Sequence, residues 1–367
     1  MNDNITCKIK VKKALIVASN GPEISFGGGQ RNLMAIKILE AKGYLVDLIV
    51  VLNEAWGVYR EDGHLIKKWK DNFGLISYFQ TSFNNPYLLD NRIHKWIKKK
   101  QKEYEIIVFR DEVIAFKSGF YLLEKSKITV DMNDFLYPHI KGLKKIKYFT
   151  IHLVLKSRIK NAWVLIPNQI NYFSKNVFCV PNLPLNSFND SKQHFIKSRS
   201  SEPSILFVGS YLSELKSYLK AASNLLLSKV PNITVYIISR SVSMKDKNEY
   251  PQKNFKWLND VEDVSGYYSK AWLSIVPGFK KDGPLIKFIE SIYFETPVVA
   301  TEVSMNGYEC FNEKENLIPA SNDTNIFTDN IVRMLKNESD LDERIRKIRL
   351  IADEKFSFNK IVNAIGF

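Results

Sequence analysis

Short apolar runs alternate with longer helical stretches along most of the chain, and this alternation restricts the fold more than any other feature. The first case is the run 13–18, which ends in the turn residues 19–22 and is followed by a helix that glycines open and by the run 46–51. A strand, a helix and a second strand in this order form the unit of a parallel sheet. The sequence therefore predicts an α/β protein, and further strands are expected at 106–109, 128–131, 163–166 and 177–180.

The same pattern starts again after a polar, turn-rich segment at 182–204. Apolar runs follow at 204–210, 233–239, 272–278 and 297–301, with helical stretches between them and over most of 322–367. A length of 367 residues also favours two domains over one. We expect two doubly wound, Rossmann-like domains that face each other across a cleft, at 1–185 and 186–350, with a C-terminal helix at 351–367 that packs back on the first domain.

Composition narrows the class of protein. Hydrophobic residues make up 45% of the chain, which argues against disorder, and the net charge of +14 favours anionic partners such as nucleotides, nucleic acid or an acidic membrane. The three cysteines, Cys7, Cys179 and Cys310, form neither a disulfide framework nor a metal site, so a reducing cytoplasm is expected. The sequence has no apolar run of 18 residues and no apolar signal core, which favours a cytoplasmic protein without a membrane span.

Glycines 27–29 stand at the start of the first predicted helix. Glycine lets a backbone approach a ligand closely, and the free N–H groups of a helix start suit a phosphate or a sugar hydroxyl. Gly28 and Gly29 are therefore candidates for binding a phosphate or a sugar, as in a nucleotide-sugar donor, and a flexible surface turn is the alternative interpretation. The third glycine of the dinucleotide fingerprint is missing, which argues against a nicotinamide-dependent oxidoreductase.

The stretch 277–307 places two charged residues on a helix that otherwise looks built for a core. Gly283-Pro284 opens this helix, and Lys287 and Glu290 lie three residues apart, so they share one of its faces among isoleucines and a phenylalanine. Lysine can hold a diphosphate, and glutamate can accept hydrogen bonds from both hydroxyls of a ribose. Because carboxylates are seldom buried without a partner, we expect Glu290 to serve a ligand. An ion pair between Lys287 and Glu290 on a solvated face is the alternative.

This stretch resembles the donor-site signature of the GT-B glycosyltransferases, specifically glycosyltransferase family 4. That signature has an acid eight residues before a glutamate. The glutamate is followed by G-x-PVV-x-T and by a later glycine. The matching residues here are Asp282, Glu290, 296–301 and Gly307. The segments GGGQRN at 27–32, VPN at 180–182 and LFVGSYLSELKS at 206–217 also resemble the family. Three positions depart from its pattern: Asp282 replaces the usual glutamate, Glu295 stands where glycine is common, and Ser210 stands where a basic residue is common.

The resemblance assigns roles to residues of the second domain. It implies that Lys287 contacts the donor diphosphate, that Glu290 holds the ribose and that Asp282 lies beside the sugar. Lys216 is expected to supply the charge that Ser210 lacks, so Lys287, Asp282 and Lys216 are the catalytic candidates. Trp257, within 255–260, is expected to line the base pocket or to pack in the core. The remaining candidate donor-binding residues are Gly209, Ser210, Gly283 and Pro284.

Other features bear on the acceptor. Polar residues follow two predicted strands, and the carboxyl ends of strands are where cleft residues belong; the acceptor candidates are Arg110, Asp111, Asp131 and Asp134, with turn capping as the alternative. Lysines and arginines among apolar residues at 139–160, together with 96–102, suit contact with an anionic membrane, while a solvated lysine face is the alternative.

The resulting prediction is an enzyme that moves a hexose from a nucleotide-sugar to a saccharide or lipid-linked saccharide, as in the assembly of bacterial surface polysaccharides. The resemblance implies retention at the anomeric carbon, and no metal or other cofactor is expected. A non-catalytic nucleotide-sugar-binding protein of the same fold and, less favoured, an NAD(P)-dependent oxidoreductase stay open. No nucleic-acid-binding module is recognisable, so a nucleic-acid partner is not expected.

Overall fold

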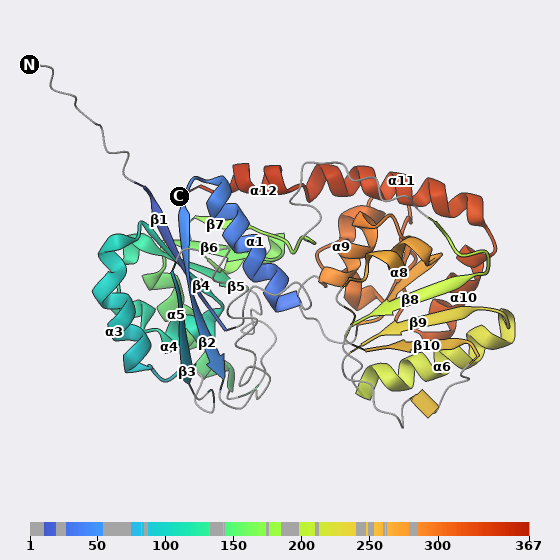
Figure 1. Cartoon of the computed structure of the whole chain (residues 1–367), viewed down its shortest axis with the longest axis horizontal. Helices are drawn as coiled ribbons and strands as arrows, with labels where there is room; N and C mark the ends of the chain where they lie inside the picture. Colours follow the sequence, from blue (N-terminus) through green and yellow to red (C-terminus); the bar gives the residue numbers. More distant parts are fainter. Residues whose placement is uncertain are drawn as a thin grey trace, which may run out of the picture.

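The computed structural model shows two α/β domains joined side by side (Figure 1). The structure describes residues 11–19, 27–53, 75–81, 83, 87–132, 142, 144–173, 176–184, 198–209, 213–239, 247–248, 253–259, 261, 263–278 and 285–366. Within these ranges no helix combines the length and the apolar character that crossing a bilayer requires.

The first domain is built on a seven-stranded sheet in the order β3-β2-β1-β4-β5-β6-β7, with every described pair parallel. Helix α1 follows β1 and lies on one face of the sheet, whereas α3, α4 and α5 contribute to the apolar core on the other face. The strands are β1 (Lys13–Ala18), β2 (Leu45–Asn53), β3 (Ile76–Thr81), β4 (Ile106–Arg110), β5 (Ile128–Met132), β6 (Asn161–Val164) and β7 (Val177–Cys179), and the helices are α1 (Gly27–Ala41), α3 (Asn91–Lys100), α4 (Glu112–Lys117) and α5 (Lys144–Arg158).

The second domain has a five-stranded parallel sheet in the order β10-β9-β8-β11-β12. Its elements are β8 (Ser204–Val208), α6 (Ser213–Lys229), β9 (Thr234–Ile238), β10 (Phe255–Leu258), α8 (Ser265–Lys270), β11 (Leu273–Val276), α9 (Ile286–Tyr293), β12 (Val298–Ala300) and α10 (Thr324–Leu335). Helix α11 (Glu338–Lys355) then runs toward the first domain, where α12 (Phe358–Ala364) ends beside α1 and β7 (Figure 1).

The predicted α/β class with two doubly wound sheets is confirmed, and most strands lie within a few residues of their expected positions. Gly43 ends α1 as its position suggests: its φ of +82° is left-handed, and the N–H of Tyr44 donates to the carbonyl of Leu39 at 3.0 Å.

Strands β3 and β10 were not expected from the sequence, and both lie at a sheet edge. Each carries polar or half-exposed residues instead of a continuous apolar run, so the signal of a buried strand is absent.

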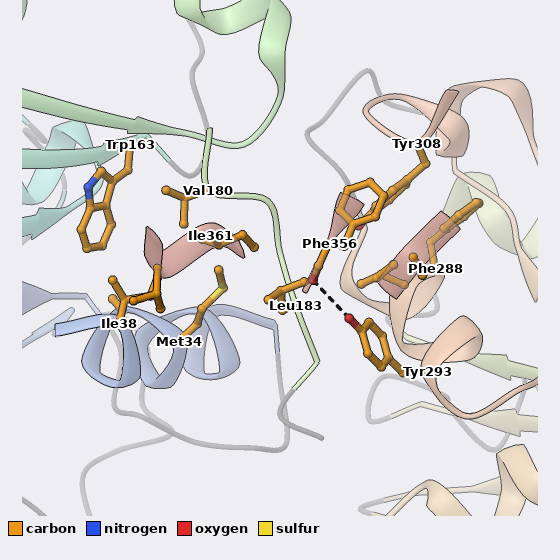
Figure 2. Packing of buried hydrophobic residues seen from close by; sticks show 14 of the residues in the cluster. Met34, Ile38, Trp163, Val180, Leu183, Phe288, Tyr293, Tyr308, Phe356 and Ile361 are labelled. Carbon is orange, nitrogen blue, oxygen red and sulfur yellow. Dashed lines mark hydrogen bonds between the residues drawn. The ribbon is translucent and has the colours of Figure 1, made fainter. Parts of the chain in front are cut away.

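One apolar cluster joins the two domains. It begins with Met34 and Ile38 of α1 and with Trp163 of β6, and it continues through the connecting segment at Val180 and Leu183 (Figure 2). On the other side it includes buried residues of α9, the segment around 308 and the end of α11, of which Phe288, Tyr293, Tyr308 and Phe356 are drawn in Figure 2. Since hydrophobic burial is the main favourable term in folding, this shared cluster holds the two sheets in one arrangement.

The end of the chain takes part in this cluster. Ile361 of α12 lies among first-domain residues in Figure 2, and Val362 and Ile365 belong to the same buried set. A methyl group added at Gly366 would lie 3.6 Å from the ring of Phe178 on β7. Helix α12 therefore contributes to the core of the first domain although it follows the second domain in sequence.

We predict that Phe288→Ala lowers the free energy of unfolding by about 3–5 kcal/mol, because the ring is wholly buried and leaves a cavity. The ring of Phe288 stacks on Tyr308 with 4.5 Å between centroids, so neighbours cannot close the space without moving. Urea unfolding followed by circular dichroism measures the change. The matched control is Phe149→Ala, whose ring is 45% exposed and whose loss should cost within about 0.5 kcal/mol. Equal effects of the two changes would contradict the shared cluster.

Candidate active site

In each sheet the strand order reverses direction at one point, and the candidate residues gather there. The reversal falls between β1 and β4 in the first sheet and between β8 and β11 in the second. In open parallel sheets, ligands bind at the carboxyl ends of the strands at such switch points. Helix α1 follows β1 and Arg110 ends β4, whereas Gly209 follows β8 and α9 follows β11. The structure thus places residues from both domains at the positions where a ligand is expected.

Helix α9 carries the two charged residues that the sequence singled out. Phe288, Ile289 and Ile292 of this helix are wholly buried, which explains why an eight-residue segment is stable as a helix. Lys287 is partly buried at the first turn, and Glu290 is only 9% exposed. Lys287 and Glu290 do not form an ion pair with each other, so the alternative of a solvated surface pair does not describe this structure.

Lys287 lies against the end of β8 and against Gly209, which directly follows that strand. Its Nζ atom is 5.0 Å from the centre of the Phe207 ring, and a methyl group built on Gly209 would lie only 3.1 Å from that Nζ. Gly209 also has a φ of +147°, which side-chain-bearing residues rarely adopt, so the backbone at this position favours glycine. Among the described residues no carboxylate forms an ion pair with Lys287, and burial lowers the pKa of its amine from 10.5 to about 8. A buried cation in this state is stabilised by a bound anion.

Glu290 receives hydrogen bonds from both domains. The hydroxyl of Tyr268 on α8 donates to Oε2 at 3.2 Å, and the side-chain amide of Gln30 on α1 donates to Oε1 at 3.5 Å. Burial raises the pKa of the Glu290 carboxyl to about 7, although the hydrogen bonds from Tyr268 and Gln30 act in the opposite direction. The contact between Gln30 and Glu290 shows that the start of α1 and the face of α9 meet across the domain boundary.

The first domain contributes a buried ionic network. Asp131, at the end of β5, accepts hydrogen bonds from the guanidinium of Arg31 at 2.8 and 3.2 Å and also from Arg110, which in turn donates to Asn32 at 2.7 Å. The Nη1 atom of Arg31 donates to the backbone carbonyls of Val180 and Pro181. Arg31 therefore ties α1 both to the sheet and to the segment that leads into the second domain.

Of the first-domain residues expected at the site, Gly28 and Gly29 lie in the first turn of α1, directly before Gln30. Arg110 and Asp131 lie at the carboxyl edge of the sheet but form contacts with each other and with Arg31. Asp131 is wholly buried, and its carboxylate accepts hydrogen bonds from both Arg31 and Arg110. Asp111 caps α4, since its side chain accepts a hydrogen bond from the N–H of Ile114 at 2.7 Å. Its φ of 110° is unusual for a residue with a side chain.

The other second-domain candidates have no described contact with Lys287 or Glu290. Lys216 lies in the first turn of α6, the helix that follows the loop after β8. Trp257 of β10 is partly buried and packs against the core of its domain with its ring centre 6.2 Å from that of Phe255; its place in a base pocket stays a prediction. Four donor or catalytic candidates and one acceptor candidate lie outside the described residues: Asp282, Gly283, Pro284, Ser210 and Asp134.

Glu295, which stands where the resembling family commonly has glycine, adopts a left-handed φ of +54° just after α9. The N–H of Thr296 donates to the carbonyl of Ser291 at 2.9 Å, and the N–H of Glu295 donates to the carbonyl of Ile292 at 3.0 Å. These are the hydrogen bonds of a helix end that normally uses glycine. The position therefore has a backbone requirement that Glu295 meets at some cost in strain.

Three residues at the site were not identified as candidates from the sequence. Gln30 and Arg31 directly follow the glycine run, and their position after Gly29 was the available signal. Tyr268 lies on a different helix, 22 residues before Glu290, and nothing in its local sequence points to the site.

Comparisons with known proteins concern the fold of the chain and the family of its second domain. Residues 202–337, which lie within the second domain, match the family described as glycosyl transferases group 1. TarM, known from S. aureus in a complex that contains UDP, aligns with 96% of this chain and 98% of its own at 13% identity, with a TM-score of 0.70. HepE from Anabaena in complex with UDP-glucose aligns over 96% and 98% at 13% identity, with a TM-score of 0.68.

WaaG, described as a glycosyltransferase involved in lipopolysaccharide biosynthesis, aligns with 96% of this chain and 99% of its own at 15% identity, with a TM-score of 0.63. A search of curated proteins finds no match. At these identities the solved structures establish a shared fold over nearly the whole chain, while the family match concerns the second domain.

We predict that Lys287→Met stabilises the protein below pH 8 and that this gain shrinks as the pH rises toward 10.5. The folded state lowers the pKa of Lys287, so between about 8 and 10.5 the unfolded chain binds more protons and wild-type stability rises with pH. Below pH 8 the gain should be on the order of 1–3 kcal/mol. Thermal unfolding at pH 7.5 and 9.5 measures it, with the exposed Lys270→Met as control. A difference that does not change with pH would show that Lys287 is not held in a desolvated position.

Proposed function

We infer that this chain, which has the GT-B fold and whose second domain is that of a group 1 glycosyltransferase, moves a hexose from a nucleotide-sugar to a saccharide or lipid-linked saccharide acceptor. The observation that carries the proposal is the position of Lys287. Its buried amine has no carboxylate partner among the described residues, and it lies beside Gly209 at the switch point of the second sheet, one turn from Glu290.

Lys287 is proposed to stabilise the departing diphosphate. When the bond from the anomeric carbon to the diphosphate breaks, its electron pair stays on the diphosphate oxygen and negative charge builds there. A cation already in place offsets this charge without reorganisation, and such preorganised groups commonly contribute most to catalysis. Lys216, Gly209 and Ser210 border the same loop and are proposed to assist, so that transfer proceeds without a metal ion. Retention at the anomeric carbon is proposed from the family resemblance.

Glu290 is proposed to bind the ribose of the nucleotide. Its carboxylate has two oxygens, each with room for further hydrogen bonds beyond those from Tyr268 and Gln30, and a ribose diol offers two donors. Asp282, Gly283 and Pro284 directly precede α9 and are proposed to lie beside the sugar. The N–H groups at Gly28 and Gly29 are proposed to approach it from the first domain. Uridine is the first nucleotide to test, because TarM and HepE were solved with UDP.

The acceptor is proposed to bind at the first domain, with Arg110 and Asp111 nearest to it at the end of β4. Asp131 lies within the neighbouring strand β5, where it accepts a hydrogen bond from the guanidinium of Arg110, and Asp134 follows that strand in sequence. A role in the assembly of a surface polysaccharide at the cytoplasmic side of the membrane is consistent with what WaaG is described to do.

A thermal-shift panel of UDP-, GDP-, ADP- and dTDP-sugars in EDTA tests the proposal. A donor present at 100 times its dissociation constant should add about 2.7 kcal/mol of stability. Turnover with the responding donor then separates an enzyme from a binding protein that merely keeps the fold. Binding without any transfer or hydrolysis would favour the non-catalytic alternative, and activity that only manganese restores would contradict the metal-independent mechanism.

For the charged pair on α9, we predict that Lys287→Ala lowers kcat/KM by about 10² to 10³, as expected for the loss of one preorganised stabilising group. Glu290→Gln should weaken nucleotide binding by about 1.5–3 kcal/mol, the range for hydrogen bonds to charged groups. Lys270→Ala, an exposed change on the neighbouring helix α8, serves as the control. Near-full activity of a folded Lys287→Ala variant would refute the assignment of α9 as the donor site.

Contact with an anionic membrane is proposed for α5. The sequence of this helix has five basic and no acidic residues, and Ile146, Phe149 and Leu153 are 66%, 45% and 47% exposed on it. These three positions follow helical spacing, so an apolar stripe lies among basic residues, as in helices that rest on a bilayer surface. Leu122 is also exposed in the short helical turn that packs against α5.

We predict that the protein pellets with vesicles that contain anionic lipid at low salt and is released as salt rises, because electrostatic attraction decays over about 10 Å at 0.1 M. Replacing Ile146 and Leu153 together by serine should weaken pelleting. Leu350→Ser, at an exposed leucine of the second domain, is the matched control. Equal partition of wild-type protein to neutral and anionic vesicles would show that the charge of α5 is merely a solvated face.

A further inference from the structure

Tyr268 is held in the site by contacts of both its ring and its backbone. Its side chain on α8 is wholly buried, and its ring stacks on Phe294 with 4.9 Å between centroids and 11° between planes. The backbone carbonyl of Tyr268 accepts a hydrogen bond from the hydroxyl of Thr296 at 2.8 Å. Both contacts come from the segment that ends α9, so Tyr268 is attached to the same structural unit that carries Glu290.

The hydroxyl of Tyr268 forms a hydrogen bond with the carboxylate of Glu290. It donates to Oε2 at 3.2 Å, whereas the donor on Oε1 is Gln30 of the first domain at 3.5 Å. The two contacts differ in kind, because Tyr268 belongs to the same domain as Glu290 and Gln30 does not. The contact with Tyr268 thus lies within the second domain, whereas the contact with Gln30 crosses the domain boundary.

We propose that Tyr268 is a positioning residue of the donor site, whose hydroxyl holds the Glu290 carboxylate in the orientation that receives the ribose diol of the nucleotide. This inference rests on the function proposed above for Glu290. A glutamate has three rotatable bonds, and binding a diol with both oxygens requires one arrangement of them. A donor on one oxygen, carried by a buried ring that stacks on Phe294, favours that arrangement before the ligand arrives.

The same contact affects the charge of Glu290. Burial raises the pKa of this carboxyl to about 7, and among the opposing effects the hydrogen bond from Tyr268 is larger than that from Gln30. The pKa of Tyr268 itself is raised well above its usual value by burial, so its hydroxyl remains a donor at neutral pH. Lys287 precedes Glu290 by three residues on the same helix and forms no ion pair with it among the described contacts. Removing the hydroxyl of Tyr268 should therefore raise the pKa of Glu290 further.

The test uses Tyr268→Phe, which keeps the ring and its stacking on Phe294, and Tyr267→Phe as the matched control. Tyr267 precedes Tyr268 on α8, and its ring packs 5.9 Å from that of Tyr236. Consecutive residues of a helix do not share a face, so Tyr267 lies on another face of α8 than Tyr268. The dissociation constant of UDP, or of the nucleoside diphosphate that the donor panel selects, is measured by calorimetry between pH 5.5 and 9.

We expect Tyr268→Phe to weaken nucleotide binding about tenfold at pH 7, the fold-change that one hydrogen bond to a charged group corresponds to. The pH at which binding weakens on the acid side should move upward. The value of kcat at saturating donor should change less than about twofold, because Tyr268 does not touch the reacting atoms. Tyr267→Phe should bind as wild type across the pH range.

A double-mutant cycle separates positioning from a general structural effect. In a Glu290→Gln background, Tyr268→Phe should cause little further loss, since the carboxylate that it orients is gone. The inference is overturned if Tyr268→Phe binds nucleotide with wild-type affinity and pH dependence, or if its loss is equally large in the Glu290→Gln background. Failure of wild-type protein to bind any nucleoside diphosphate would instead overturn the proposed function, so the two failures are distinguishable.

Discussion

The arrangement of the site depends on the hydrogen bonds that the guanidinium of Arg31 donates. This guanidinium holds the carboxylate of Asp131 at the end of β5 and the carbonyls of Val180 and Pro181 in the connecting segment. Burial lowers the pKa of Arg31 to about 9, which still leaves it charged at neutral pH. Leaving Asp131 or the two carbonyls without this donor would cost several kcal/mol, so the first turn of α1 has one stable position. Gln30, the preceding residue, reaches Glu290 from that position.

Helix α9 shows how one short element serves both stability and chemistry. Its apolar side chains enter the cluster that joins the domains, and the same packing desolvates Lys287 and Glu290. Desolvation acts on the two groups in opposite directions: it lowers the pKa of Lys287 to about 8 and raises that of Glu290 to about 7. Both groups thus lose part of their preference for the charged state, and a ligand that carries an anion and a pair of hydroxyls would restore it.

The sequence predicts the parts of this structure that leave a local signal. Lys287 and Glu290 could be chosen because an i, i+3 charged pair inside an apolar helix is unusual, and most strands could be found from their buried runs. Gln30 and Tyr268 could not, because their relation to Glu290 depends on how two helices from other parts of the chain are placed beside α9. Asp131 was correctly expected at the carboxyl edge of the sheet, but its pairing with Arg31, 100 residues away, leaves no trace in spacing. Strands β3 and β10 could not be found because most of their residues are polar or only half-buried, so neither strand leaves a continuous apolar run.

The return of α12 to the first domain has a consequence for how the molecule is made. Ile361, Val362 and Ile365 complete the apolar cover beside α1 and β6, yet a ribosome synthesises them only after the whole second domain. During translation the first sheet can form early, but part of its surface stays uncovered until the final helix emerges. The two domains are therefore not independent modules in biosynthesis, and cutting the chain at the connecting segment would separate the first domain from a piece of its own core.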